Sequence, residues 1–357
     1  MFKRLLLLGL TMLLATSALD AQTQSDRPDF ETRAKQFLKR FPQADLNQDG
    51  TLTLDEARKF NQQRRGEKPK PTKNTRSLRP TFPDFSYGDH ERQCFDLWLV
   101  PDADEPTPLA IYIHGGGFKG GDKSKVSDAI VQQFLNEGIA FCSMNYRLSD
   151  SGPYPMMMHD AARGLQTIRA HAGEWKINPE KVACFGGSAG AGITLWLAFH
   201  DDLADPDSED PIARQSTRII AAGTSGGQST YDWRTYKKWF GVENLQQHPA
   251  LGPFYLVETE EDLKSERVIK LMEDASPINH LTKDDQIPVY MYYGGLNKPV
   301  DETSSPGVWV HHVLLGLKLQ EAMEKLGLTC IVRGRDVIPE HDPYGSVQNF
   351  LIAKLKE

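Results

Sequence analysis

The chain has 357 residues, of which 39% are hydrophobic and 25% are charged, and its formal net charge is −7. This composition is typical of a globular protein with one large domain and an appendage, and it excludes disorder as the overall state. The sequence has no basic stripe of the kind that neutralises phosphates, which argues against nucleic acid as a partner.

The chain begins with a pattern typical of a signal peptide. Lys3 and Arg4 precede an apolar run over residues 5–14, and small residues follow, with cleavage sites after Ala18 or Ala21. The alternative, an uncleaved anchor, is disfavoured because the run is short and wrongly flanked. We expect residues 1–21 to be removed and the protein to be exported to the periplasm or the extracellular space, without stable membrane insertion.

Residues 22–61 form a small unit around the segment DLNQDGTLTLDE, which fits the EF-hand loop. Gly50 supplies its sharp turn. The ligand positions hold Asp45, Asn47, Asp49, the carbonyl of Thr51, Thr53 through a water, and Glu56. The pattern predicts calcium in a structural or docking role, with a solvated acidic turn as the alternative. Because only one such loop is present, it is expected to pair with another copy or to dock on the rest of the chain.

Residues 62–81 form a basic, proline-containing linker, and residues 82–357 form the main domain. Apolar segments predict strands at 94–100, 109–115, 139–146, 181–187, 218–225, 287–295 and 328–334. Between them, helical spacing recurs over 158–168 and over 313–323. Alternating strands and helices predict an α/β domain with a mostly parallel sheet covered by helices on both faces. The region 224–280, with Trp233, Trp239 and Phe254, is expected to cap the pocket.

The four cysteines, Cys94, Cys142, Cys184 and Cys330, are widely spaced and lie in apolar, strand-like segments. This spacing does not match a metal site. We expect buried thiols, and a single disulfide is the alternative.

The segment CFGGSAGAG surrounds Ser188 with small residues at a predicted strand-to-helix junction. G-x-S-x-G over 186–190 in this context indicates a nucleophile elbow, in which a sharp turn presents the serine. A phosphate-binding loop is disfavoured because no Lys-Ser/Thr pair follows the glycines. A tight turn without chemistry remains the other alternative.

The segment YIHGGGF, over residues 112–118, ends an earlier strand with a run of glycines. Backbone N–H groups there can stabilise the negative charge that develops on a carbonyl oxygen during acyl transfer. We expect Gly116, Gly117 and the amide of Ala189 to form this oxyanion hole, with His114 holding the loop through hydrogen bonds. The alternative is a flexible loop that happens to be rich in glycine.

The segments HGGGF, GGSAGAG, NYRLSDSGPYPMMMHDAARGLQTIRAH and DHERQCFDLWLVPDAD resemble the α/β-hydrolase superfamily, in particular its hormone-sensitive-lipase and carboxylesterase branch. The resemblance runs from about Phe82 to the C-terminus. It implies an α/β-hydrolase fold, attack by Ser188 on an ester carbonyl, a histidine base and an acyl-enzyme that water hydrolyses, without a cofactor for catalysis.

Together with the leader pattern, the resemblance implies an exported serine carboxylesterase acting on a small-molecule ester or an esterified polysaccharide. One alternative is a peptidase or polysaccharide deacylase with the same fold. Another is a catalytically impaired relative that serves as a calcium-dependent binding module.

In this family the base follows the last strand, which points to His341 in DVIPEHDPYG, whereas His311 and His312 are expected to be capping or surface residues. The acid is less well defined. The family register places Asn297 at the acid position, and asparagine cannot neutralise an imidazolium. We therefore expect Asp301 to act as the acid, with Glu302 as the next candidate.

Overall fold

The structure is a computed structural model that describes residues 38, 42–46, 48–51, 53, 56 and 78–357. The chain divides into two compact units, residues 1–75 and 76–357, and the division falls inside the linker expected at 62–81. The predicted signal peptide, Asn47 and the linker up to residue 77 lie outside the described residues.

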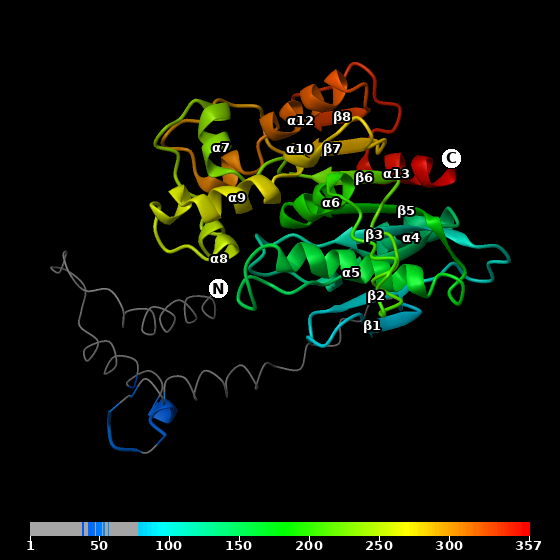
Figure 1. The fold of residues 1–357 in the computed structure, drawn as a ribbon, viewed down its shortest axis with the longest axis horizontal. Helices are drawn as coiled ribbons and strands as arrows, with labels where there is room; N and C mark the ends of the chain where they lie inside the picture. Colours follow the sequence, from blue (N-terminus) through cyan, green and yellow to red (C-terminus); the bar gives the residue numbers. More distant parts are fainter. Residues whose placement is uncertain (1–37, 39–41, 47, 52, 54–55, 57–77) are drawn as a thin grey trace. The chain divides into compact units, whose positions relative to one another are not determined.

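The second unit is built on one eight-stranded sheet with the order β1-β2-β4-β3-β5-β6-β7-β8 (Figure 1). The strands are β1 (Phe82–Ser86), β2 (Cys94–Trp98), β3 (Thr107–Ile113), β4 (Ala140–Met144), β5 (Ile177–Gly187), β6 (Ala221–Ser225), β7 (Val289–Tyr293) and β8 (Cys330–Gly334). β2 pairs antiparallel with β1 and β4, and every other neighbouring pair is parallel.

All the strands expected from the sequence are present, as β2 to β8, whereas β1 was not predicted. β1 lies at the edge of the sheet, contains Pro83 and is mostly exposed. An edge strand needs no continuous apolar run, so the sequence carries little signal for it.

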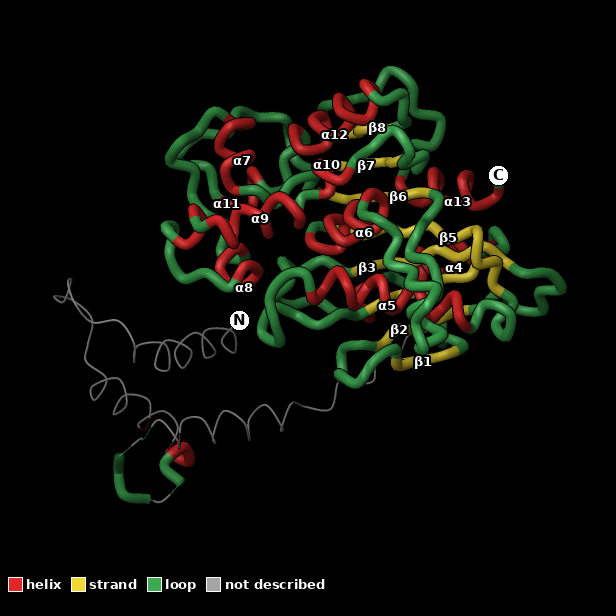
Figure 2. The backbone as a smooth tube through the Cα atoms, in the orientation of Figure 1, coloured by secondary structure: helices red, strands yellow, loops and turns green. Residues whose placement is uncertain are grey.

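Helices cover both faces of the sheet (Figure 2). They are α4 (Asp128–Asn136), α5 (Met156–Ala170), α6 (Ala189–Phe199), α7 (Trp233–Phe240), α8 (Leu251–Tyr255), α9 (Glu266–Ala275), α10 (Pro277–His280), α11 (Pro306–Trp309), α12 (Leu314–Lys325) and α13 (Val347–Lys356). Short 3₁₀ turns occur at η1 (Pro42–Ala44), η2 (Lys123–Lys125) and η3 (Asp262–Lys264). The predicted mostly parallel sheet between two helical layers is confirmed.

The core has two parts, because successive side chains of a strand point to opposite faces. In β3, Leu109 and Ile111 join the cluster that includes α5, α6 and α12, whereas Ala110 joins the cluster formed with α4 and α13. Every residue of α6 is buried, which explains why its sequence is apolar on all sides. The four cysteines are free and buried, as expected.

The connection between β6 and β7 carries α7, α8 and α9, which gather at one end of the sheet (Figure 2). This connection contains the region that the sequence predicts as a cap. Across the described part of the chain, none of the helices is both long and apolar enough to cross a bilayer.

Candidate active site

Ser188 lies at the sharp turn between β5 and α6, with φ +51° and ψ −119°. A non-glycine residue in this conformation is strained and needs the surrounding structure to hold it. A Cβ on Gly186 would come within 2.6 Å of the carbonyl oxygen of Ile113, and a Cβ on Gly190 would come within 2.7 Å of the carbonyl oxygen of His114. The small neighbours of Ser188 therefore have a steric cause, as a nucleophile elbow requires.

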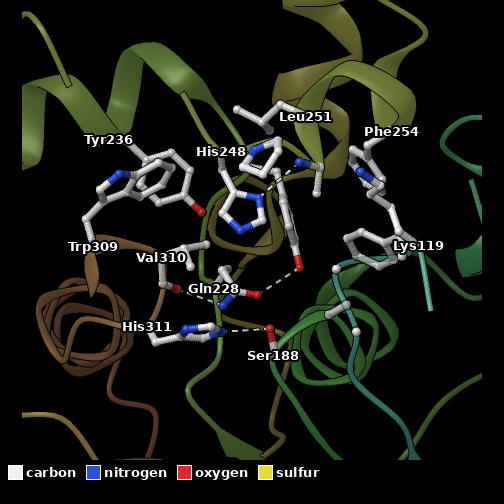
Figure 3. A pocket seen from close by; sticks show the side chains of 17 residues that line it. Lys119, Ser188, Gln228, Tyr236, His248, Leu251, Phe254, Trp309, Val310 and His311 are labelled. Carbon is white, nitrogen blue, oxygen red and sulfur yellow. Dashed lines mark hydrogen bonds between the residues drawn. The ribbon is translucent and has the colours of Figure 1, made fainter. Parts of the chain in front are cut away.

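The side chain of Ser188 is hydrogen-bonded to a histidine. The distance from Ser188 Oγ to His311 Nε2 is 2.8 Å (Figure 3), and His311 Nδ1 lies 3.0 Å from the carbonyl oxygen of Gly307. A carbonyl oxygen can only accept, so Nδ1 carries the proton and Nε2 keeps a lone pair for the serine hydroxyl. This is the tautomer that a general base needs.

The backbone around His311 is held in place by Gln228. Its amide nitrogen donates to the carbonyl oxygens of Gly226, at 2.7 Å, and Val310, at 2.8 Å. Gly226 has φ +59°, and a Cβ there would lie 3.2 Å from Cδ2 of His311. A glycine at this position lets the imidazole approach the carboxyl end of β6.

The structure does not bring His341 to Ser188, which corrects the expected base. His341 is exposed in the loop after β8 and lines a separate cavity with residues of α12 and β8. The neighbouring Asp342 accepts from Tyr290, at 2.7 Å, and from Arg333, at 2.8 Å. Tyr290 in turn packs on Phe350 of α13, and these contacts fix the position of the loop.

The expected acid also lies apart from the histidine. Asp301 is exposed, and its Oδ1 accepts from the backbone and hydroxyl of Thr303 and from the hydroxyl of Ser304, which lowers the pKa of Asp301. Glu302 accepts from Asn244.

Asn297, at the family's acid position, is exposed and donates its backbone N–H to Asp336. Within the described part of the chain, no carboxylate is hydrogen-bonded to His311, and the carbonyl of Gly307 occupies its Nδ1.

The glycine run lies beside the serine, as the sequence suggested. Gly116, with φ +128°, and Gly117, with φ +59°, line one cavity together with Ser188 and Ala189. Buried His114 supports this loop, with Nδ1 at 2.8 Å from the carbonyl oxygen of Gly115 and Nε2 at 3.1 Å from the guanidinium of Arg92.

Burial lowers the pKa of His114 to about 4, so its imidazole is neutral at pH 7. Its ring also stacks on Tyr146, whose hydroxyl donates to the His114 carbonyl at 2.9 Å. These contacts of His114 hold the glycine loop, residues 115–117, in a fixed position.

Ser188 and His311 lie between two cavities. The first, of about 340 Å³, is lined mainly by apolar and aromatic side chains (Figure 3). They include Phe118, Tyr231, Tyr236, Leu251, Phe254 and Trp309. Several of these come from the predicted capping region, including Phe254, whereas Trp233 and Trp239 do not line this cavity.

The second cavity, of about 780 Å³, is an open groove that is also lined by Ser188 and His311. It is lined by glycines at the carboxyl ends of β3, β5, β6 and β7 and by the exposed cations Lys298 and Arg335, without a carboxylate among its lining residues. His312 donates from Nε2 to the carbonyl of Lys298 at 2.9 Å, which fixes the loop after β7 beside His311.

His248 places a polar group in the apolar cavity. Its Nδ1 accepts from the backbone N–H of Ala250 at 3.1 Å, so Nε2 carries the proton. Burial, together with the nearby His311 and Lys119, lowers the pKa of His248, which favours this neutral form. In Figure 3 the ring lies above Gln228 and His311. Within the described chain, Nε2 makes no hydrogen bond, so it is available as a donor to a ligand.

Sequence reasoning missed His311 and His248. The residue type and local pattern do not identify His311 as the partner of Ser188, because it lies in a short turn between α11 and α12. Only contacts in the folded chain distinguish His311 from His341. Gln228 binds the backbone next to His311, and Gly226 leaves room for the His311 ring. The loop that contains His341 is instead fixed by the bond from Tyr290 to Asp342.

In the described part of the predicted calcium loop, over residues 45–56, carboxylates accept hydrogen bonds from other residues of the loop. Asp45 accepts from the backbone N–H of Gly50 at 2.7 Å, and Gly50 has φ +82°. Glu56 folds back to accept from the hydroxyl of Thr53 at 2.7 Å.

Comparison with known proteins gives a consistent picture. The BD-FAE family model matches residues 95–308. Probable carboxylic ester hydrolase LipM of Mycobacterium tuberculosis is 28% identical over 216 residues, or 59% of this chain and 47% of that protein. A probable isoprenylcysteine alpha-carbonyl methylesterase of Arabidopsis thaliana is 29% identical over 142 residues, or 40% of this chain and 30% of that protein. The chain spans less than half the length of these relatives.

Two solved structures superpose with a TM-score of 0.55. The acetyl ester-xyloside bifunctional hydrolase from Caldicellulosiruptor lactoaceticus is 16% identical, covering 72% of this chain and 86% of that chain. A truncated carbohydrate esterase from gut microbiota is 15% identical, and the match covers 77% of this chain and 96% of that chain. At these identities the likeness shows a shared fold.

Proposed function

This chain belongs to the BD-FAE family and has the α/β-hydrolase fold, and on that premise we propose that it is a serine hydrolase that cleaves carboxylic esters. The observation that carries the proposal is the hydrogen bond between Ser188 Oγ and His311 Nε2, made in the tautomer that can accept the serine proton.

The proposed reaction has two halves. His311 Nε2 takes the proton of Ser188 as Oγ forms a bond to the ester carbonyl carbon, and the amides of Gly116, Gly117 and Ala189 stabilise the oxyanion. The C–O bond to the alcohol then breaks, and the alcohol leaves with the proton from Nε2. Water repeats the sequence on the acyl-enzyme, which releases the acid and restores Ser188.

The third member of the site is the carbonyl of Gly307 rather than a carboxylate. It orients the imidazole and stabilises the transient imidazolium through its dipole, but it carries no full charge. We expect a working serine–histidine pair with a lower turnover than a complete triad would give.

The two cavities suggest how an ester would bind. The apolar cavity suits the acyl group, and the open groove suits an alcohol portion that extends into solvent, including a sugar. The carbohydrate-directed names of the two similar structures agree with an esterified polysaccharide as substrate. Nε2–H of His248 is placed to donate to a polar atom of the bound ester.

Two further features are proposed for the N-terminal part. The loop over residues 45–56 binds calcium, supported by its ligand pattern and by the turn at Gly50. We propose a structural or docking role for it rather than signalling, because calcium is plentiful outside the cytoplasm. Export after removal of residues 1–21 rests on the leader pattern. Calorimetry with calcium tests the first proposal, and N-terminal sequencing of the protein from the culture medium or the periplasm tests the second.

The function is tested with purified protein, chromogenic esters of increasing acyl length and acetylated polysaccharide. We expect ester hydrolysis, a covalent adduct on Ser188 with a serine-directed phosphonate, and loss of both in Ser188→Ala. Cleavage of peptides but not esters would indicate a peptidase. A folded protein with neither turnover nor adduct would contradict the proposal and favour a binding module.

A further inference from the structure

We propose that His200, Asp274 and His280 bind a divalent transition-metal ion, with zinc as the best match. His200 directly follows α6, Asp274 lies in α9 and His280 ends α10. One ligand atom from each residue lies within 4.8 Å of the other two. Three separate helices thus bring two imidazoles and a carboxylate to one point.

The hydrogen bonds around the histidines point to a ligand, independently of this proximity. His200 Nδ1 lies 3.0 Å from the carbonyl oxygen of Asp201, and His280 Nε2 lies 2.6 Å from the carbonyl oxygen of Asp274. Each carbonyl requires a proton on the nitrogen that it faces, so in the neutral ring the other nitrogen keeps its lone pair. Metal-binding histidines are oriented by the same kind of bond from the nitrogen that does not bind the metal.

The carboxylate is oriented in a similar way. Asp274 Oδ2 accepts from the hydroxyl of Tyr154 at 2.5 Å, and that hydroxyl accepts from Trp196 Nε1 at 3.2 Å. Oδ1 takes no part in this bond and lies 3.9 Å from His280 Nε2, the nitrogen that donates to the Asp274 carbonyl, which leaves Nδ1 as the metal-binding nitrogen of His280. A buried tyrosine thus fixes which carboxylate oxygen faces the cluster.

The two rings are also held by packing. The His200 ring stacks on Trp196 with 4.0 Å between centroids, and the His280 ring lies 4.7 Å from His200. Both histidines are half-buried and Asp274 is exposed, so an ion can reach the cluster from solvent. Preorganised rings lower the cost of ordering the ligands on binding.

The ligand types select the metal. Two imidazole nitrogens and one carboxylate oxygen suit zinc, with water in the fourth position, whereas calcium and magnesium prefer sites made of oxygen alone. The site therefore differs in selectivity from the calcium loop.

The position of the site indicates a structural role. α6 has 11 residues, so the cluster lies about 17 Å along this helix from Ser188. An ion there would fasten α9 and α10 to the end of α6. α8 belongs to the same connection between β6 and β7 as α9 and α10, and it forms one wall of the apolar cavity through Leu251 and Phe254. We expect bound zinc to raise the stability of this wall without taking part in the chemistry.

The test uses full-length protein from which bound metal has been removed with a chelator. Excess calcium is then added back so that the calcium loop is occupied, and the protein is titrated with zinc chloride in a calorimeter. Wild type should bind one zinc ion more than His280→Ala and than Asp274→Asn, in which the amide oxygen can still accept from Tyr154. Removing a partner that only orients a ligand weakens metal binding about 10–100-fold, so removing a ligand should cost at least that much.

His341→Ala is the matched control, since it removes an exposed histidine outside the cluster, and it should bind zinc like wild type. Zinc should also raise the melting temperature of wild type and of this control, but not that of the two cluster variants. Equal zinc stoichiometry and affinity in wild type and in whichever cluster variant folds would overturn the proposal, as would no zinc binding to wild type at this site.

Discussion

Ser188 Oγ lies 2.8 Å from His311 Nε2, although the two residues are 123 positions apart in the chain. The histidine follows the serine, as in the family's order, but it comes from the connection between β7 and α12 instead of the loop after β8. The proposed base therefore enters the site one strand earlier than the sequence suggested, and it meets a carbonyl where a carboxylate was expected.

Neither candidate acid should matter for turnover. In Asp301→Asn the amide oxygen can still accept from Thr303 and Ser304, and the residue does not touch His311. Asn297→Asp adds a charge beside Asp336, and Asn297 makes no hydrogen bond to His311. Because neither side chain is hydrogen-bonded to Ser188 or His311, we expect kcat within about twofold of wild type for both. A gain of an order of magnitude in Asn297→Asp would show that the family register holds.

The turn at Ser188 should not tolerate a methyl group at Gly190. A Cβ there would lie within 2.7 Å of backbone atoms of Ile113 and His114, which cannot move aside like a flexible side chain. Gly190→Ala should reduce the free energy of unfolding by about 1–3 kcal/mol or more and abolish activity. Gly173→Ala is the control, because a Cβ there meets no atom within 4 Å. Equal denaturant midpoints for the two variants would refute this steric account.

Acidification should destabilise the fold through His114. The pKa of His114 is lowered to about 4 in the folded protein. Between pH 6.5 and about pH 4, His114 is therefore protonated in the unfolded chain but neutral in the folded one. The unfolding free energy should therefore fall as the pH drops from 6.5 to about 4, by up to about 1.4 kcal/mol per pH unit for this group. The lowered pKa values of His159 and His248 act in the same direction.

Urea unfolding of wild type and His114→Gln at several pH values isolates the contribution of His114. The variant should show a flatter dependence on pH below 6.5. Identical slopes would mean that His114 is not held neutral by the fold.

His248 should affect substrate binding more than chemistry. His248→Phe removes the Nε2–H donor but keeps a ring in the cavity, and a net hydrogen bond is worth about 0.5–1.5 kcal/mol. We expect KM for an ester with a polar acyl or alcohol group to rise about 2–10-fold, with little change for a purely apolar ester. His248→Gln retains a donor and should recover part of the loss. A uniform fall in kcat for all esters would assign His248 another role.

Much of the architecture could be predicted from the sequence, because buried parallel strands have continuous apolar segments and the glycine elbow has few steric solutions. The segments at 109–115 and 181–187 became β3 and β5, and Ser188 lies at the turn that was expected. The histidine could not be predicted in the same way. Its position depends on contacts between distant residues, such as Gln228 with Val310, and the loop that contains His341 is fixed by the bond from Tyr290 to Asp342.

The carbonyl of Gly307 illustrates the same limit. A backbone group leaves no signature in residue type, so a search for Asp or Glu could find only exposed carboxylates such as Asp301. The zinc ligands also escaped notice, because His200 and Asp274 are brought together by helix packing rather than by spacing in the chain.

The most direct test of the account compares kcat for a chromogenic ester in His311→Ala and His341→Ala, with the fold of each variant verified by circular dichroism. If His311 is the base, its removal should lower kcat by about 10⁴-fold or more, as losing the base does in serine proteases. His341→Ala should keep kcat within about twofold of wild type, as expected for an exposed residue. The reverse result, with activity retained in His311→Ala and lost in His341→Ala, would contradict the serine–histidine pair seen in the structure.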